Sequence, residues 1–163
     1  MIRSTIAAIA LSALAACSTI GRPPPAVGQA EAELVQRWGP PSGRYALPAG
    51  GNRLEYATGP YGRETWMIDV DAGGRVLGAR QVLNEASFAD FQRRAPGMPR
   101  DELLRTLGRP GERRSGGYQG GEVWSWRYPT NDCLWFESSI GPDGIVRDGA
   151  YNVDPRCDAS SRS

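Results

Sequence analysis

The side chains that most often carry covalent or acid–base chemistry are scarce in this chain. It contains three cysteines and no histidine, and all 19 of its basic residues are arginine. Without histidine or lysine, the chain lacks the commonest general base, the commonest metal ligand and the amine that forms Schiff bases. Cys17, Cys133 and Cys157 are therefore the first residues whose chemistry has to be considered.

Cys17 ends an N-terminal stretch with the pattern of an export signal. Arg3 is followed by an apolar run over residues 6–14, and two alanines directly precede Cys17. The run is shorter than the roughly 20 residues that a membrane-spanning helix needs. The stretch resembles the lipobox of bacterial lipoproteins. That resemblance implies that residues 1–16 are a signal peptide, which is removed, and that Cys17 is acylated with fatty chains such as palmitate.

The residue after the lipobox bears on whether a lipoprotein is sorted to the inner or the outer membrane. Ser18 follows Cys17, where an aspartate would imply retention in the inner membrane. The resemblance therefore implies an outer-membrane lipoprotein that faces the periplasm, tied to the membrane by the lipid on Cys17. The alternative is an ordinary secretory signal in which the cysteine is coincidental.

Cys133 and Cys157 are the two remaining cysteines. Export would place them in an oxidising compartment, where a cysteine pair favours a disulfide over a metal site or a nucleophile. In the chain-entropy view, closing a loop of this length would stabilise the fold by roughly 3 kcal/mol. We expect a Cys133–Cys157 bridge and no metal site.

Acidic residues could in principle perform acid–base catalysis without histidine. Asp69, Asp71, Asp143 and Asp148, however, fall at predicted strand edges or turns, where carboxylates are mostly solvated or form the turn. The glycine pairs at 73–74 and 116–117 lack the lysine and helix of a phosphate-binding loop. We expect neither an enzyme nor a cofactor.

The charge balance restricts the partners. The chain has 19 basic and 18 acidic residues, and removal of Arg3 with the signal makes the two counts equal. A nucleic-acid binder needs a basic excess that displaces counterions, and a polybasic membrane patch needs one as well. Neither is expected here.

An internal duplication organises the rest of the chain. With a shift of about 70 positions, residues 28–41 match residues 97–111, and the turn at 70–74 matches that at 140–144. In each copy, apolar residues at i, i+1 and i+4 predict a short helix that ends at Gly39 or Gly108. Residues 84–94 predict an extra helix in the second copy, capped by Asn84.

Alternating strands follow each helix. Residues 66–70 and 76–82 in the first copy, and 123–128, 133–140 and 145–153 in the second, show the period of two that predicts antiparallel strands. Trp124, Trp126 and Tyr128 are expected in the core. Trp135 lies on the opposite face of its strand with Glu137 and Ser139. It is either a partner contact or packed against the first unit or under the bridge.

The second copy resembles the SmpA/OmlA (BamE-like) family of outer-membrane lipoproteins. The residues that carry the likeness are Phe88, Gly97-Met98, Leu103, Leu107-Gly108-Arg109-Pro110 and Trp124-Ser125-Trp126-Arg127-Tyr128. The tandem arrangement is similar to the β-lactamase inhibitor protein (BLIP-like) fold. Pro99 stands where the SmpA/OmlA family usually has a capping threonine, and the duplication also departs from its single unit.

The resemblance implies an α+β fold of two tandem BamE/BLIP-like units, each with one or two short helices on a three-stranded antiparallel sheet. We expect a signal at 1–16, a proline-rich tether at 17–27, units at 28–82 and 83–157, and a flexible tail at 158–163. The implied function is a non-enzymatic scaffold or assembly factor that binds an envelope protein. The alternative is a periplasmic inhibitor or binding module that uses its sheet face.

Overall fold

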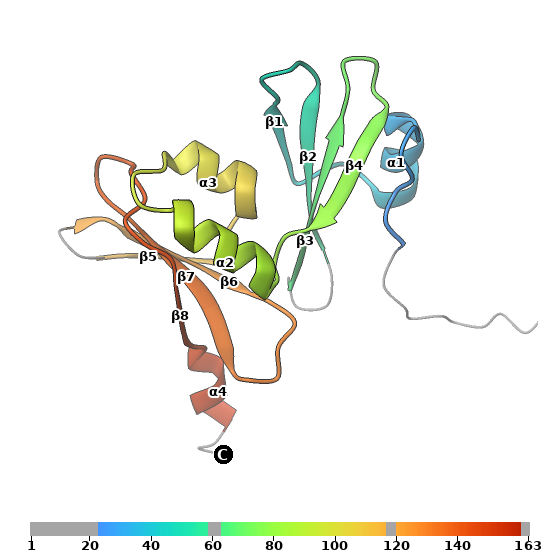
Figure 1. Cartoon of the computed structure of the whole chain (residues 1–163). Helices are drawn as coiled ribbons and strands as arrows, with labels where there is room; N and C mark the ends of the chain where they lie inside the picture. Colours follow the sequence, from blue (N-terminus) through green and yellow to red (C-terminus); the bar gives the residue numbers. More distant parts are fainter. Residues whose placement is uncertain (1–22, 59–62, 117–119, 161–163) are drawn as a thin grey trace, which may run out of the picture.

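The computed structural model describes residues 23–58, 63–116 and 120–160, and no side chains of residues 158–160. The signal stretch and Cys17 lie outside the described residues. These described residues fold as an α+β protein with two four-stranded antiparallel sheets and four helices (Figure 1). None of the described helices is long and apolar enough to cross a membrane.

The first unit places one helix on one sheet. Its elements, in chain order, are α1 (Glu31–Trp38), β1 (Gly43–Ala46), β2 (Asn52–Thr58), β3 (Glu64–Val70) and β4 (Val76–Gln81). The strands pair in the order β1-β2-β3-β4, as successive antiparallel neighbours. The even positions of β2 and β3, such as Leu54 and Ile68, pack against Leu34 and Trp38 of α1. The predicted helix and its apolar stripe are confirmed.

The second unit has two helices on one face of its sheet and a short helix at its end. Its elements are α2 (Glu85–Arg94), α3 (Arg100–Leu107), β5 (Glu112–Ser115), β6 (Glu122–Arg127), β7 (Leu134–Ile140), β8 (Ala150–Val153) and α4 (Pro155–Ser160). The side chain of Asn84 accepts the backbone N–H of Ser87, which confirms the predicted cap of α2. Trp124, Trp126 and Tyr128 are buried with Phe88, as expected.

The prediction of three strands in each unit was wrong, because each sheet has four. β5 is the strand missed in the second sheet, whereas both β1 and β2 lie outside the ranges predicted for the first sheet. β1 and β5 each follow the helix-terminating glycine–proline segment. Each is four residues long, lies at a sheet edge and is largely exposed. Such strands carry no apolar alternation, so the period of two that marks a strand in a sequence is missing from them.

The last strand is also shorter than predicted. Pairing with β7 begins only at Ala150, whereas Ile145 and Val146 make only isolated bridges. A Cβ on Gly149 would lie 2.8 Å from the ring of Phe136, so the backbone approaches the core too closely there for a side chain. α4 covers Pro155–Ser160, which extends a helix into the first residues of the predicted tail.

A junction joins the two units. The carboxylate of Glu55 is fully buried, and it accepts hydrogen bonds from the Tyr45 hydroxyl at 2.5 Å and the Arg109 backbone N–H at 3.0 Å. Burial, and then the hydrogen bond to Glu55, raise the pKa of Tyr45, so the hydroxyl keeps its proton and remains a donor. A Cβ on Gly108 would lie 2.8 Å from Thr65, so the units meet closely here.

Two further contacts hold the junction. Arg53 donates to Asp69 in its own sheet and, at 3.0 Å, to the backbone oxygen of Arg105 at the end of α3. Met67 of β3 belongs to the core cluster of the second unit. The first sheet is therefore covered by α1 on one face and by the second unit on the other.

Candidate binding site on the open face of the second sheet

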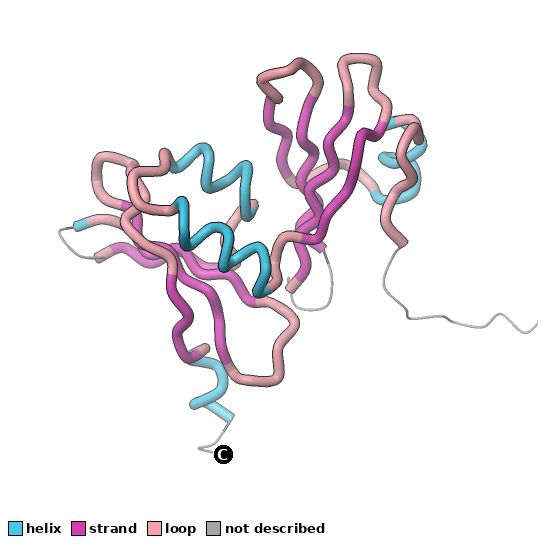
Figure 2. The backbone as a smooth tube through the Cα atoms, viewed as in Figure 1, coloured by secondary structure: helices cyan, strands magenta, loops and turns pink. Residues whose placement is uncertain are grey.

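The second sheet has a face that its helices do not occupy. α2 and α3 lie along the other face, as Figure 2 shows. Odd-numbered residues of β6 and β7, among them Ser125 and Glu137, point away from the core cluster that contains Trp124, Trp126 and Phe136. We call the face carrying Ser125 and Glu137 the open face.

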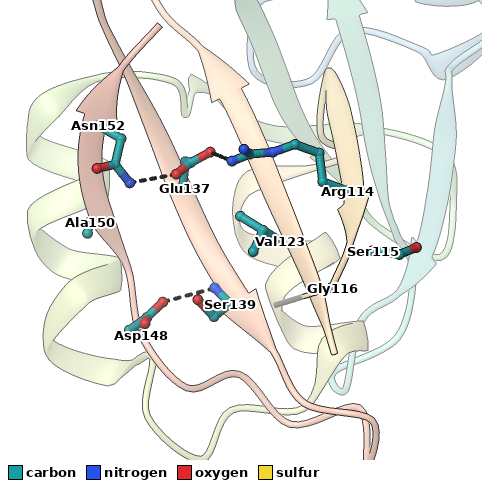
Figure 3. Close-up of a pocket in the computed structure, with 9 residues that line it drawn as sticks. All are labelled: Arg114, Ser115, Gly116, Val123, Glu137, Ser139, Asp148, Ala150 and Asn152. Atoms are coloured by element: carbon teal, nitrogen blue, oxygen red, sulfur yellow. Dashed lines mark hydrogen bonds and ion pairs between the residues drawn. The ribbon is translucent and has the colours of Figure 1, made fainter. Parts of the chain in front are cut away.

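The open face contains a hollow of about 370 Å³. Contributions come from all four strands and from the segment before β8 (Figure 3). The lining residues are Arg114, Ser115, Gly116, Val123, Glu137, Ser139, Asp148, Ala150 and Asn152. Six of these nine residues have polar or charged side chains.

Glu137 is the centre of this surface. One of its carboxylate oxygens accepts from the Arg114 guanidinium and, at 2.9 Å, from the Ser125 hydroxyl. The other accepts from the Asn152 side chain at 2.5 Å. These partners belong to β5, β6 and β8, so one buried carboxylate on β7 links every strand of the sheet. Since it is already bound on both oxygens, Glu137 acts here as a structural acceptor.

Asp148 forms the opposite wall of the hollow. One carboxylate oxygen accepts the Ser139 backbone N–H at 2.9 Å, as Figure 3 shows, and the side chain is exposed. Arg114 on the other side is about half exposed. The hollow therefore presents a cation and an anion to solvent on opposite sides, which suits hydrogen bonding to a polar backbone or to mixed charges.

Trp135 lies on the open face, as the alternation predicted, but it is not an exposed contact. Only 1% of its surface is accessible, because the guanidinium groups of Arg114 and Arg127 lie 5.2 and 4.9 Å from its ring centroid. The candidate partner contact at Trp135 is thus corrected to a packed position. Sequence alternation identifies a face, whereas long arginine side chains from neighbouring strands decide whether that face is covered.

A buried ion pair borders the open face. Arg127 donates two hydrogen bonds to Asp154, at 2.5 and 2.8 Å, and a weaker pair to Glu112 at 3.3–3.4 Å. The hydrogen bond from Arg127, followed by that from the Arg156 backbone, lowers the pKa of Asp154 against the opposing effect of burial. The pair fixes the start of α4 to β6.

The same region brings Cys133 and Cys157 together. Their Cα atoms are 5.9 Å apart across a sequence separation of 24, within the range that a disulfide spans. Cys133 has φ of 52°, and its carbonyl accepts the backbone N–H of Asp154 at 2.9 Å. The geometry is compatible with the expected bridge between the β6–β7 loop and α4.

The four aspartates considered for acid–base chemistry all have structural partners. Asp69 accepts from Arg53, and Asp71 accepts the Arg75 backbone N–H at 2.8 Å in the turn. The backbone N–H of Ile145 and then Arg147 lower the pKa of Asp143. In the described ranges, no three histidine, cysteine or acidic side chains are grouped as a metal ion would require.

Sequence reasoning placed Trp135, Glu137 and Ser139 on one face but missed the residues that complete the site. Arg114 lies in the unpredicted strand β5, and Asn152 carries no local pattern that would pair it with Glu137. No protein-family model, curated protein or solved structure matches this chain.

Proposed function

We propose that this chain is a non-enzymatic outer-membrane lipoprotein that binds another envelope protein through the open face. The observation that carries this proposal is the polar hollow on a sheet face whose central carboxylate, Glu137, is tied to all four strands. A surface that is rigid before binding loses less entropy when a partner docks.

The proposed anchor comes from the sequence. The lipobox-like stretch ending in Cys17 supports lipid attachment, and Ser18 supports the outer membrane, with the folded part in the periplasm. The Cys133–Cys157 bridge is part of the same proposal, since it requires an oxidising compartment. The packing of helices on one face of the second sheet is compatible with a relationship to the SmpA/OmlA (BamE-like) family and favours a scaffold or assembly role, although that family has a single unit.

A second candidate is an inhibitor or binding module of the BLIP-like kind. The tandem of two units and the open face favour it. A scaffold would remain in a stable envelope complex, whereas an inhibitor would bind one soluble enzyme and block its activity. The two proposals share the open face and differ in the partner.

Two measurements test the main proposal. Cys17→Ser should abolish incorporation of radiolabelled palmitate and move the protein out of the membrane fraction. Ser139→Arg places a long cation in the hollow, so it should abolish co-purification of the partner from detergent extracts. Gln36→Arg, on the exposed face of α1, is the matched control and should retain the partner. Equal partner recovery with both variants would refute binding through the open face.

A further inference from the structure

A second hollow, of about 340 Å³, lies where the first sheet meets the helices of the second unit. Its lining residues are Arg80, Val82, Ala86, Ser87, Asp90, Arg94 and Thr106. Arg80 lies on β4, Ser87 and Arg94 on α2, and Thr106 on α3. We call this hollow the junction groove. It is separate from the open face in its position and in its residues.

Arg80 lines the groove with about half of its side chain exposed, and no carboxylate among the described residues lies within hydrogen-bond distance of it. It pairs across the sheet with Met67, so it lies on the face that meets the second unit. Its nearest carboxylate, Asp69, is 3.9 Å away and already receives hydrogen bonds from Arg53 at 2.6 and 2.8 Å. Among the described residues, the Arg80 side chain has no hydrogen-bond partner, and this 3.9 Å ion pair is its closest contact with a carboxylate.

The other carboxylates at the groove are occupied as well. Asp90 accepts from Arg93 at 2.8 Å and from Arg94 at 2.6 and 3.0 Å. Glu102 lies 3.9 Å from Arg94. Burial, followed by the positive charge of Arg53 and with a smaller effect from Arg94, lowers the pKa of Arg80, while Asp69 opposes this. The groove thus has more cationic than anionic groups.

We propose that the junction groove binds an oxyanion of the phosphate class, held by Arg80 and supported by Arg94 and the Ser87 hydroxyl. A guanidinium donates two parallel hydrogen bonds to two oxygens of one anion, which a single chloride ion does not match. The Thr106 hydroxyl lines the groove but donates its hydrogen to the Glu102 backbone oxygen at 2.7 Å, so it is not counted as a donor to the anion. The bound anion would join β4 of the first unit to α2 of the second.

Calorimetric titration of the full-length protein with inorganic phosphate, at constant ionic strength set by sodium chloride, tests this site. Saturable binding of one phosphate is expected. Arg80→Gln should weaken it about tenfold or more, because a charge-assisted bidentate contact is lost. Arg94→Gln should weaken it less, since Asp90 already engages Arg94. Arg37→Gln on α1 is the exposed control and should bind as the unsubstituted protein does.

Ser87→Glu keeps the proposal testable if Arg80→Gln fails to fold. A glutamate in the first turn of α2 is compatible with the helix dipole, and it should abolish phosphate binding by filling the groove with negative charge. Dimethyl phosphate distinguishes the sources of the anion. If dimethyl phosphate binds as tightly as inorganic phosphate, the natural ligand is a phosphodiester such as a lipid headgroup. If only inorganic phosphate binds, the ligand is the free ion. Absence of saturable binding, or equal affinity in folded Arg80→Gln, overturns the proposal.

Discussion

The two sheets of this protein share a strand order and differ in what covers them. In the first sheet Glu55 pairs across the strands with Met67, and both are buried against the second unit. In the second sheet the corresponding pair is Ser125 and Glu137 on the open face, where Glu137 lines the hollow. One sheet is therefore enclosed between two layers, whereas the other has a face that its helices leave uncovered.

The two sheet faces differ in the side chains at a few corresponding positions. The enclosed face of the first sheet carries Met67, which joins the second core, and Glu55, whose hydrogen bonds cross the junction. The open face satisfies its polar groups internally, through Glu137 and its three partners. The enclosed face satisfies its buried polar groups partly through the second unit, whereas the open face satisfies them within its own sheet, as a face without a packed layer must.

The largest predicted losses of stability come from truncating one core leucine in each unit. Leu103 and Leu34 are corresponding helix positions, and both are fully buried. Leu103→Ala should cost about 4 kcal/mol and Leu34→Ala about 3 kcal/mol, because the core around Leu103 is the larger and less able to close a cavity. Urea unfolding of both variants measures the difference. A larger cost for Leu34→Ala would contradict the view that the second core dominates.

The proposed bridge should stabilise only the second unit. Cys157→Ser should lower the free energy of unfolding by about 3 kcal/mol, because the loop to Cys133 is no longer closed in the unfolded chain. Thiol reduction of the unsubstituted protein should give the same loss. Unfolding curves that coincide with and without reductant would show that no bridge forms.

The buried ion pair at the rim of the open face gives a pH dependence. Asp154→Asn should cost about 2 kcal/mol at neutral pH, because Arg127 loses its closer anionic acceptor and keeps only Glu112 at 3.3–3.4 Å. Since the folded pKa of Asp154 is lowered, its contribution is fully present above the unfolded pKa of about 4 and is lost as pH falls through the folded pKa.

Thermal unfolding between pH 7 and pH 2 measures that dependence. The stability difference between Asp154→Asn and the unsubstituted protein should shrink below about pH 4. Asp132→Asn, at an exposed position of the neighbouring loop, is the control and should change stability little. A difference that is constant across this range would remove Asp154 as the titrating group.

The smallest stability effect is expected at Arg114. Its side chain is about half exposed and its partner Glu137 keeps two other donors, so Arg114→Gln should cost no more than about 1 kcal/mol. The same change should weaken partner binding clearly, since Arg114 lines the hollow. Strong destabilisation with unchanged binding would make Arg114 a purely structural residue.

Local patterns predicted much of the fold. The apolar stripes, the Asn84 cap and the turns at Gly74 and Gly144, with φ of 74° and 76°, depend on neighbouring residues and were identified from the sequence. β1 and β5 were missed because short edge strands need no apolar alternation. The cover over Trp135 and the junction at Glu55 depend on residues far apart in the chain, whose contacts no local pattern encodes.

Site-specific photo-cross-linking in the native envelope tests the central claim most directly. A photoreactive residue at position 123, inside the hollow on β6, should give one discrete protein adduct, because Val123 would face the bound partner. The same residue at position 36, on the exposed face of α1, should give none. An adduct from position 36, with none from position 123, would contradict binding through the open face.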